Sequence, residues 1–117
     1  MEFRPLGRTG VSVSRFCFGA GMFGYFGNND EKECKKMVDH ALAEGINYFD
    51  TSDVYSHGES ETILGKALKG KRQDVILATK FSLPMDQNPN HKGNSRRWII
   101  EEVENSLRRL DTEYIDL

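Results

Sequence analysis

The sequence has few of the residues that hold small or unusual proteins together. Its 117 residues include two cysteines, three prolines and three histidines. Cys17 and Cys34 have no metal-ligand spacing to each other or to a histidine, so we expect buried free thiols and no metal site. No apolar run is long enough to span a bilayer, and the first residues do not form a charged leader with an apolar core. The sequence therefore predicts a cytoplasmic protein without a membrane span.

An excess of charge of one sign is also missing. Lys and Arg together number 16, Asp and Glu together number 18, and the formal net charge is -2. This balance gives no electrostatic reason to expect nucleic acid or an anionic membrane as a partner. The length corresponds to one ordinary domain. Binding of small molecules or of proteins is left open.

Apolar residues recur with two alternating periods along the chain. The opening segment, 3–13, predicts a β-hairpin that turns at its glycines. After it, short apolar runs typical of buried strands alternate with amphipathic stretches typical of helices. We expect strands at 14–18, 46–49, 74–79 and from 114, and helices at 30–45, 60–70 and 95–110. This α/β order indicates a parallel sheet with right-handed crossovers, either an open doubly wound sheet or part of a (β/α)8 barrel.

Two of these helices have clear start signals. Asp30 is predicted to cap the first, whose apolar stripe comprises Cys34, Met37, Val38, Ala41 and Leu42. Ser95 is predicted to cap the last, whose apolar stripe comprises Ile99, Val103, Leu107 and Leu110. Residues 81–94 form a long polar loop between strand and helix, and loops of this length are often functional.

The most informative polar residues follow two of the apolar strands. Asp50 comes directly after 46–49, Tyr55 lies five residues further on, and Lys80 follows the run 75–79. In parallel α/β folds, sites form at the carboxyl ends of the strands, so we expect these side chains to meet. An ammonium beside a phenol stabilises the phenolate, and Asp50 would keep Lys80 charged. Such a relay suits protonation of the alkoxide formed when a nicotinamide cofactor delivers hydride to a carbonyl.

Each of the three residues also has a structural interpretation. Asp50 could cap a turn, Tyr55 could lie at the rim of a fold, and Lys80 could be a surface charge that ends a strand. Their joint position at successive strand ends favours a site. The glycine-rich segment 19–27 lacks the G-x-G-x-x-G pattern, so a Rossmann site is not supported. It is either a place of close approach to a flat ligand ring or a flexible loop.

With these residues in place, the sequence resembles the aldo-keto reductases, nicotinamide-dependent enzymes with a (β/α)8 TIM-barrel fold. The resemblance is carried by the segments FRPLGRTGVSVSRFCFG, ALAEGINYFDTSDVYSHGESETILGKALKG, VILATK and SRRWIIEEVENSLRRLDTEYIDL. It implies that Tyr55 is the general acid in carbonyl reduction and that Lys80 and Asp50 tune it. The implied substrate is a small carbonyl compound.

The resemblance also implies where the cofactor lies. Ala20, Gly21, Met22 and Asp50 would lie near the nicotinamide and its ribose, with NADP(H) favoured over NAD(H). Members of the family usually have Thr where this sequence has Ala20, so the contact there would involve the backbone.

Residues 1–117 correspond to the amino-terminal half of such a barrel, preceded by a β-hairpin cap and ending within the fourth strand. The histidine that completes the family's catalytic set, and the half that binds most of the cofactor, lie outside these residues. We therefore expect residues 1–117 alone to be inactive and to self-associate through exposed sheet edges. The alternative is a non-catalytic, reductase-like subunit with a regulatory or protein-binding role, because fold alone does not fix function.

Overall fold

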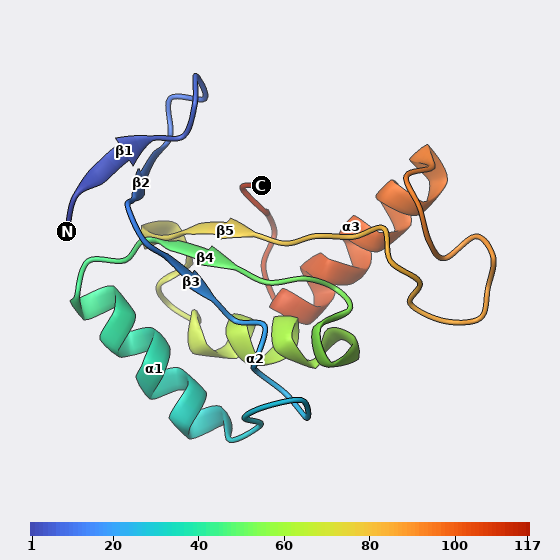
Figure 1. Ribbon diagram of the computed structural model, residues 1–117, viewed down its shortest axis with the longest axis horizontal. Coiled ribbons are helices and arrows are strands. Elements are labelled where there is room, and N and C mark those ends of the chain that lie inside the picture. Colours follow the sequence, from blue (N-terminus) through green and yellow to red (C-terminus); the bar gives the residue numbers. More distant parts are fainter.

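Three short parallel strands form the centre of the molecule in Figure 1, a computed structural model that describes all residues from Met1 to Leu117. The sheet order is β3 (Cys17–Gly19), β4 (Tyr48–Asp50) and β5 (Ile76–Ala78). Gly19 pairs with Asp50, and Asp50 pairs with Ala78, so the three carboxyl ends lie at one edge of the sheet. The predicted α/β class with a parallel sheet is confirmed.

Helices cover only one face of this sheet. Helices α1 (Glu31–Ala43) and α2 (Glu59–Ala67) lie against it, and α3 (Arg96–Leu110) packs on α2 (Figure 1). The chain also contains two short 3-10 turns, η1 (Tyr55–Gly58) and η2 (Arg72–Asp74). Side chains alternate between the faces of a strand, so one row enters the helix-covered core and the next points away. The core row is Phe18, Phe49 and Leu77, and the row facing away is Cys17, Tyr48 and Ile76.

The predicted hairpin is present at the amino terminus. Strands β1 (Phe3–Pro5) and β2 (Ser12–Ser14) pair antiparallel. Asn47, which precedes β4, fixes the hairpin to the sheet: its Oδ1 accepts from the Ser14 N–H at 2.7 Å, and its Nδ2 donates to the Ser12 carbonyl at 3.1 Å. Ser14 therefore belongs to the hairpin, and the strand predicted at 14–18 begins only at Cys17. The role of the hairpin as a barrel cap stays a prediction.

The first helix begins where predicted, but its buried face is narrower than the sequence indicates. The Asp30 carboxylate accepts from the backbone N–H groups of Lys32 and Glu33. Cys34 is buried as expected, whereas Met37 is 48% exposed. Cys17 is also exposed, because it lies on the face of the sheet without helices. The predictions of buried Met37 and buried Cys17 are therefore wrong.

The buried face of α3 differs from the predicted apolar stripe. Ile99 and Val103 are 39% and 41% exposed. Leu110 is buried as predicted, but the rest of the side that packs against the molecule carries Trp98, Glu102 and Ser106. The polar members of this face are bonded to the half-buried Arg109 on the same helix, so α3 packs partly through polar groups where apolar packing was expected.

Residues 114–117 lie beside β5 but do not form the regular fourth strand that was predicted. The Thr79 N–H donates to the Leu117 carbonyl at 3.0 Å, and the Asp116 N–H donates to the Leu77 carbonyl at 3.0 Å. The Leu77 N–H, however, donates to the Asp116 carboxylate at 2.8 Å. A side chain thus takes a donor that a regular strand would bond through its backbone.

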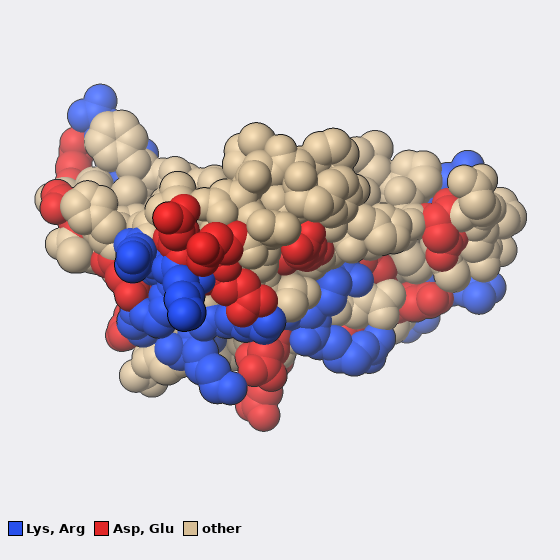
Figure 2. Space-filling model, turned by 90° about the horizontal axis from the view of Figure 1, so that it is seen from below, with Lys and Arg blue, Asp and Glu red and all other residues tan.

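Acidic and basic side chains are mixed on the side of the molecule seen in Figure 2. Lys66 pairs with Glu31 across α2 and α1, and Lys35 pairs with Asp39 within α1. Exposed pairs of this kind contribute little to stability, because water and salt screen their attraction. No helix combines the length and the apolar character needed to cross a membrane.

Gly65 sets the close approach of α2 and α3. A Cβ at this position would lie 2.3 Å from the Leu110 carbonyl oxygen, which is backbone and cannot rotate away. We expect Gly65→Ala to lower the free energy of unfolding by about 1 to 3 kcal/mol in urea denaturation, even though Ala is the better helix former. Gly19→Ala is the matched control, because a Cβ there would meet nothing within 4 Å. Equal stability of the two variants would contradict this packing.

Candidate functional site

The carboxyl ends of β4 and β5 deliver two charged side chains to one place. Asp50 is the last residue of β4, and Lys80 follows β5 by two residues. Backbone pairing continues beyond the assigned strands, since the Thr51 N–H donates to the Ala78 carbonyl at 3.0 Å and the Asp53 N–H donates to the Lys80 carbonyl at 3.1 Å. The relative position of Asp50 and Lys80 is therefore set by the sheet.

Lys80 and Asp50 form a close ion pair. The ammonium donates to both carboxylate oxygens, at 2.7 and 2.6 Å, and to the Thr51 carbonyl at 2.6 Å. Partial burial disfavours the charged ammonium, but the hydrogen bonds and the attraction from Asp50 outweigh it, so the pKa of Lys80 is raised above its ordinary value. The two side chains remain 45% and 33% exposed. Lys80 is therefore held as a fixed cation that a ligand can reach.

Tyr55 lies against this pair. It is the first residue of η1, and its ring centre is 5.0 Å from the Lys80 Nζ. Its ring also lies beside the glycine-rich loop, since a Cβ at Gly21 would be 3.5 Å from it. The structure thus brings together the three residues that the sequence singled out, Asp50, Tyr55 and Lys80.

The turn after Tyr55 has an unusual backbone. Ser56 and His57 have φ values of 47° and 54°, and Gly58 has a φ of 89°, so three successive residues are left-handed. Non-glycine residues in this region each cost on the order of 1 kcal/mol and persist where surrounding contacts impose them. One such contact is the Phe26 N–H, which donates to the Ser56 Oγ at 3.3 Å. The strain is located next to the candidate proton donor.

The loop predicted to contact the cofactor has a buried base and an exposed tip. Ala20 is fully buried, its N–H donates to the Asp50 carbonyl at 2.8 Å, and its carbonyl accepts from the Ser60 Oγ at 2.7 Å. Gly21 is half-buried beside the Tyr55 ring, and Met22 is exposed. Ala20 therefore supports the strand end from beneath, and the surface open to a ligand begins at Gly21. The cofactor contact predicted for Ala20 stays a prediction.

Beneath the site lies a group of buried charges that sequence reasoning missed. Asp53, Glu61 and Glu102 are almost fully buried. Arg109 donates to the carboxylates of both glutamates and to the Ser106 Oγ. A signal was present: Glu102, Ser106 and Arg109 have i, i+4, i+7 spacing, which places them on one face of a helix.

Asp53 has no cation of its own in this group. Its Oδ1 accepts from the Ser52 hydroxyl at 3.2 Å, and its buried Oδ2 has no hydrogen-bond partner. Burial raises the pKa of Asp53, and the neighbouring Glu102 charge raises it further, to about 6. Asp53 follows Asp50 and precedes Tyr55, so a carboxyl group that holds its proton more tightly than an ordinary aspartate lies within the segment that carries the site.

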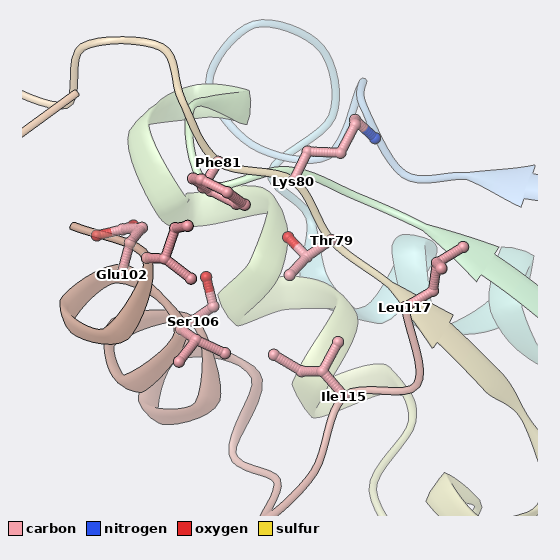
Figure 3. Close-up of a pocket in the computed structure, with 9 residues that line it drawn as sticks. Thr79, Lys80, Phe81, Glu102, Ser106, Ile115 and Leu117 are labelled. Atoms are coloured by element: carbon pink, nitrogen blue, oxygen red, sulfur yellow. The ribbon is translucent and has the colours of Figure 1, made fainter. Parts of the chain in front are cut away.

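An apolar hollow of about 160 Å³ lies on the other side of Lys80. It is lined by Thr79, Lys80, Phe81, Ile99, Glu102, Val103, Ser106, Ile115 and Leu117. Figure 3 shows the Lys80 ammonium pointing away from it, and neither Asp50 nor Tyr55 is part of its lining. The hollow is therefore distinct from the surface at which the three candidate residues meet.

In proteins with a parallel α/β sheet, the functional site lies at the carboxyl ends of the strands, and this chain has a polar cluster at that edge. Within this class, residues 15–117 match the family model described as "Aldo/keto reductase family". The chain belongs to this family, as the resemblance in its sequence predicted.

Individual relatives agree with this assignment. The chain is 45% identical to aldo-keto reductase YhdN from Bacillus subtilis and 40% identical to a protein from Oryza sativa subsp. japonica named "Probable voltage-gated potassium channel subunit beta". Both alignments include the whole chain but only 37% and 36% of the relative. The chain thus spans little more than a third of the length of these relatives.

Solved structures give the same result. The holo form of aldo-keto reductase AKR11C1 from Bacillus halodurans matches with a TM-score of 0.86 and 43% identity, over 98% of this chain and 38% of that one. A putative aldo-keto reductase from Pseudomonas aeruginosa matches with a TM-score of 0.83 and 33% identity, over 97% of this chain and 43% of that one. These structural neighbours are TIM barrels.

Proposed function

We propose that the protein containing this chain reduces aldehydes or ketones to alcohols with a nicotinamide cofactor. Tyr55 is the general acid, Lys80 tunes it, and Asp50 orients Lys80. The observation that carries the proposal is the Lys80 ammonium, which is bonded to both Asp50 oxygens and lies 5.0 Å from the centre of the Tyr55 ring. Family membership supports an oxidoreductase.

The residues of this chain have complementary tasks in such a reaction. The Tyr55 hydroxyl donates a proton to the substrate oxygen as negative charge develops there. The Lys80 ammonium stabilises the phenolate that remains, and the Asp50 carboxylate keeps that ammonium charged and in place. When bound, the cofactor supplies the hydride.

The exposed surface fits a nicotinamide ring at this place. A Cβ at Gly19 would meet nothing within 4 Å, so the backbone beside Asp50 is open to a flat ligand. Gly21, Met22 and Asp50 would face the nicotinamide and its ribose, with Ala20 supporting them. We propose NADP(H) in preference to NAD(H), and a small carbonyl compound as substrate.

The remaining expectations from the sequence belong to the same proposal. Residues 1–117 form the amino-terminal half of a TIM barrel, and β1 and β2 are its hairpin cap. The protein acts in the cytoplasm. Alone, residues 1–117 are inactive and self-associate through exposed sheet edges. Residues 114–117 bond along β5, so the edge at β3 is the one left to pair.

The test uses the complete natural polypeptide that contains these residues. It is incubated with NADPH or NADH and a panel of aldehydes and ketones, and consumption of the reduced nicotinamide is followed by absorbance. We expect carbonyl-dependent oxidation, faster with NADPH, and none with residues 1–117 alone. Absence of oxidation with every carbonyl and both cofactors would refute the proposal.

A second function is a regulatory or protein-binding subunit without catalysis. The observation that favours it is the 40% identity to a relative named as a probable potassium channel subunit beta. Stable binding to a channel protein, together with no carbonyl reduction by the complete polypeptide, would support the subunit. Carbonyl reduction by the complete polypeptide would support the enzyme.

A further inference from the structure

Buried side chains link the two chain segments that carry Lys80 and Tyr55. Thr79, which precedes Lys80, donates from its Oγ1 to the Glu61 Oε1 at 2.6 Å. Glu61 is fully buried near the start of α2. The residue next to Lys80 is thus bonded to a side chain of the helix that follows the Tyr55 turn.

The second oxygen of Glu61 continues this link to α3. Its Oε2 accepts from the Arg109 Nε, and Arg109 is anchored in turn on Glu102 and Ser106. The Arg109 guanidinium thereby satisfies two carboxylates that would otherwise be buried and unpaired, a costly arrangement. Its place is therefore determined by several bonds at once.

The aliphatic part of Arg109 contacts the turn that carries Tyr55. A Cβ at Gly58 would lie 2.7 Å from the Arg109 Cδ, so only glycine leaves room for this side chain. Gly58 ends the left-handed turn that begins just after Tyr55. A strained turn keeps its shape only where its surroundings impose it, and the half-buried Arg109 is part of those surroundings.

We propose that Glu61 and Arg109 are positioning residues that fix the separation between the Lys80 ammonium and the Tyr55 ring. Glu61 holds Lys80 through Thr79, and Arg109 holds Tyr55 through Gly58. Neither residue touches the substrate or the proton that is transferred. The proposal rests on the proposed function, because it assigns these residues a role in the same reaction.

The test removes the first bond of this link without changing the shape of the side chain. Thr79→Val deletes the hydroxyl that Glu61 accepts from, whereas Thr79→Ser keeps it. In the complete polypeptide, we expect Thr79→Val to lower kcat for carbonyl reduction by about 10- to 100-fold, since a displacement near 1 Å can cost that much. The KM for the cofactor stays unchanged, the pH profile of kcat shifts, and Thr79→Ser restores both kcat and the profile.

A second pair of variants tests the other end of the link. Arg109→Lys keeps the positive charge but loses the planar group that reaches two carboxylates, so kcat falls with a shifted pH profile. Arg108→Lys, one residue away and exposed, leaves both unchanged. If Thr79→Val and Arg109→Lys reduce the amount of folded protein but leave the pH profile of kcat unshifted, the proposal is overturned.

A structural measurement separates this proposal from the proposed function. In crystal structures of the Thr79→Val and Thr79→Ser variants, the distance between the Lys80 Nζ and the Tyr55 ring centre is compared with the 5.0 Å found here. We expect a displacement of about 0.5 Å or more in Thr79→Val only, the tolerance beyond which a site loses its geometry. An unchanged distance would overturn the positioning role, whereas absence of carbonyl reduction by the unmodified protein would overturn only the proposed function.

Discussion

Replacement of Tyr55 by Phe is expected to lower kcat for carbonyl reduction by about 10²- to 10⁴-fold, the usual contribution of a general acid. The substitution removes only the hydroxyl, so the ring stays beside Gly21 and the Lys80–Asp50 pair stays intact. The dissociation constant of the cofactor, measured by fluorescence titration, should therefore change little. Steady-state kinetics with the complete polypeptide checks the effect on kcat.

The matched control for this experiment is Tyr114→Phe. Tyr114 is also partly exposed, and its hydroxyl contacts only the Arg72 carbonyl, far from the strand ends that carry the site. It should retain full activity. If Tyr55→Phe instead weakened cofactor binding and left kcat intact, Tyr55 would be a binding residue and the assignment of the proton donor would be wrong.

Asp53→Asn is expected to remove a pH dependence of stability. In the folded chain the pKa of Asp53 is raised from 3.8 to about 6. Between about pH 4 and pH 6 the folded state thus binds more protons than the unfolded state, so the free energy of unfolding falls as pH rises through this window. A shift of this size corresponds to about 3 kcal/mol. The amide of Asn cannot ionise, so the variant should lose this slope and be more stable than the unmodified chain near neutral pH.

Urea denaturation at several pH values from 4 to 7 measures this effect. Asp111→Asn is the control, because Asp111 is exposed and left-handed at the end of α3, a conformation that Asn also adopts readily. It should keep the slope of the unmodified chain. If the free energy of unfolding of Asp53→Asn falls with pH as steeply as that of the unmodified chain, then Asp53 ionises in the folded state without loss of stability.

The candidate site could be predicted because its signals are local. Asp50 and Lys80 each follow an apolar run, and parallel strands bring their carboxyl ends to one edge, so position along the chain translated into position in space. Asp30 and Ser95 likewise cap their helices through bonds to residues two or three positions away. Such features depend on a few neighbouring residues.

The features that the sequence did not predict depend on contacts between residues far apart in the chain. The sequence pattern on α3 placed Ile99 and Val103 inside, but the buried face is determined by Glu61 on α2, which pairs with Arg109 forty-eight positions later. A buried glutamate is predictable only when its partner is known. In the same way, Asp116 interrupts the predicted last strand by accepting a backbone N–H from β5.

The buried base of the glycine-rich loop determines how that loop can move. The Ala20 backbone is bonded to Asp50 and Ser60, and the Phe23 side chain is buried in the core, so the loop is anchored on both sides of Gly21. The tip is closed on itself by the Asn28 N–H, which donates to the Met22 carbonyl at 2.8 Å. The Tyr25 N–H also donates to the Glu59 carboxylate at 2.9 Å, so the loop is held as one rigid unit against η1 and α2. Because the tip is also bonded to Ser56, beside Tyr55, a substitution that distorts this loop would also misalign the proton donor.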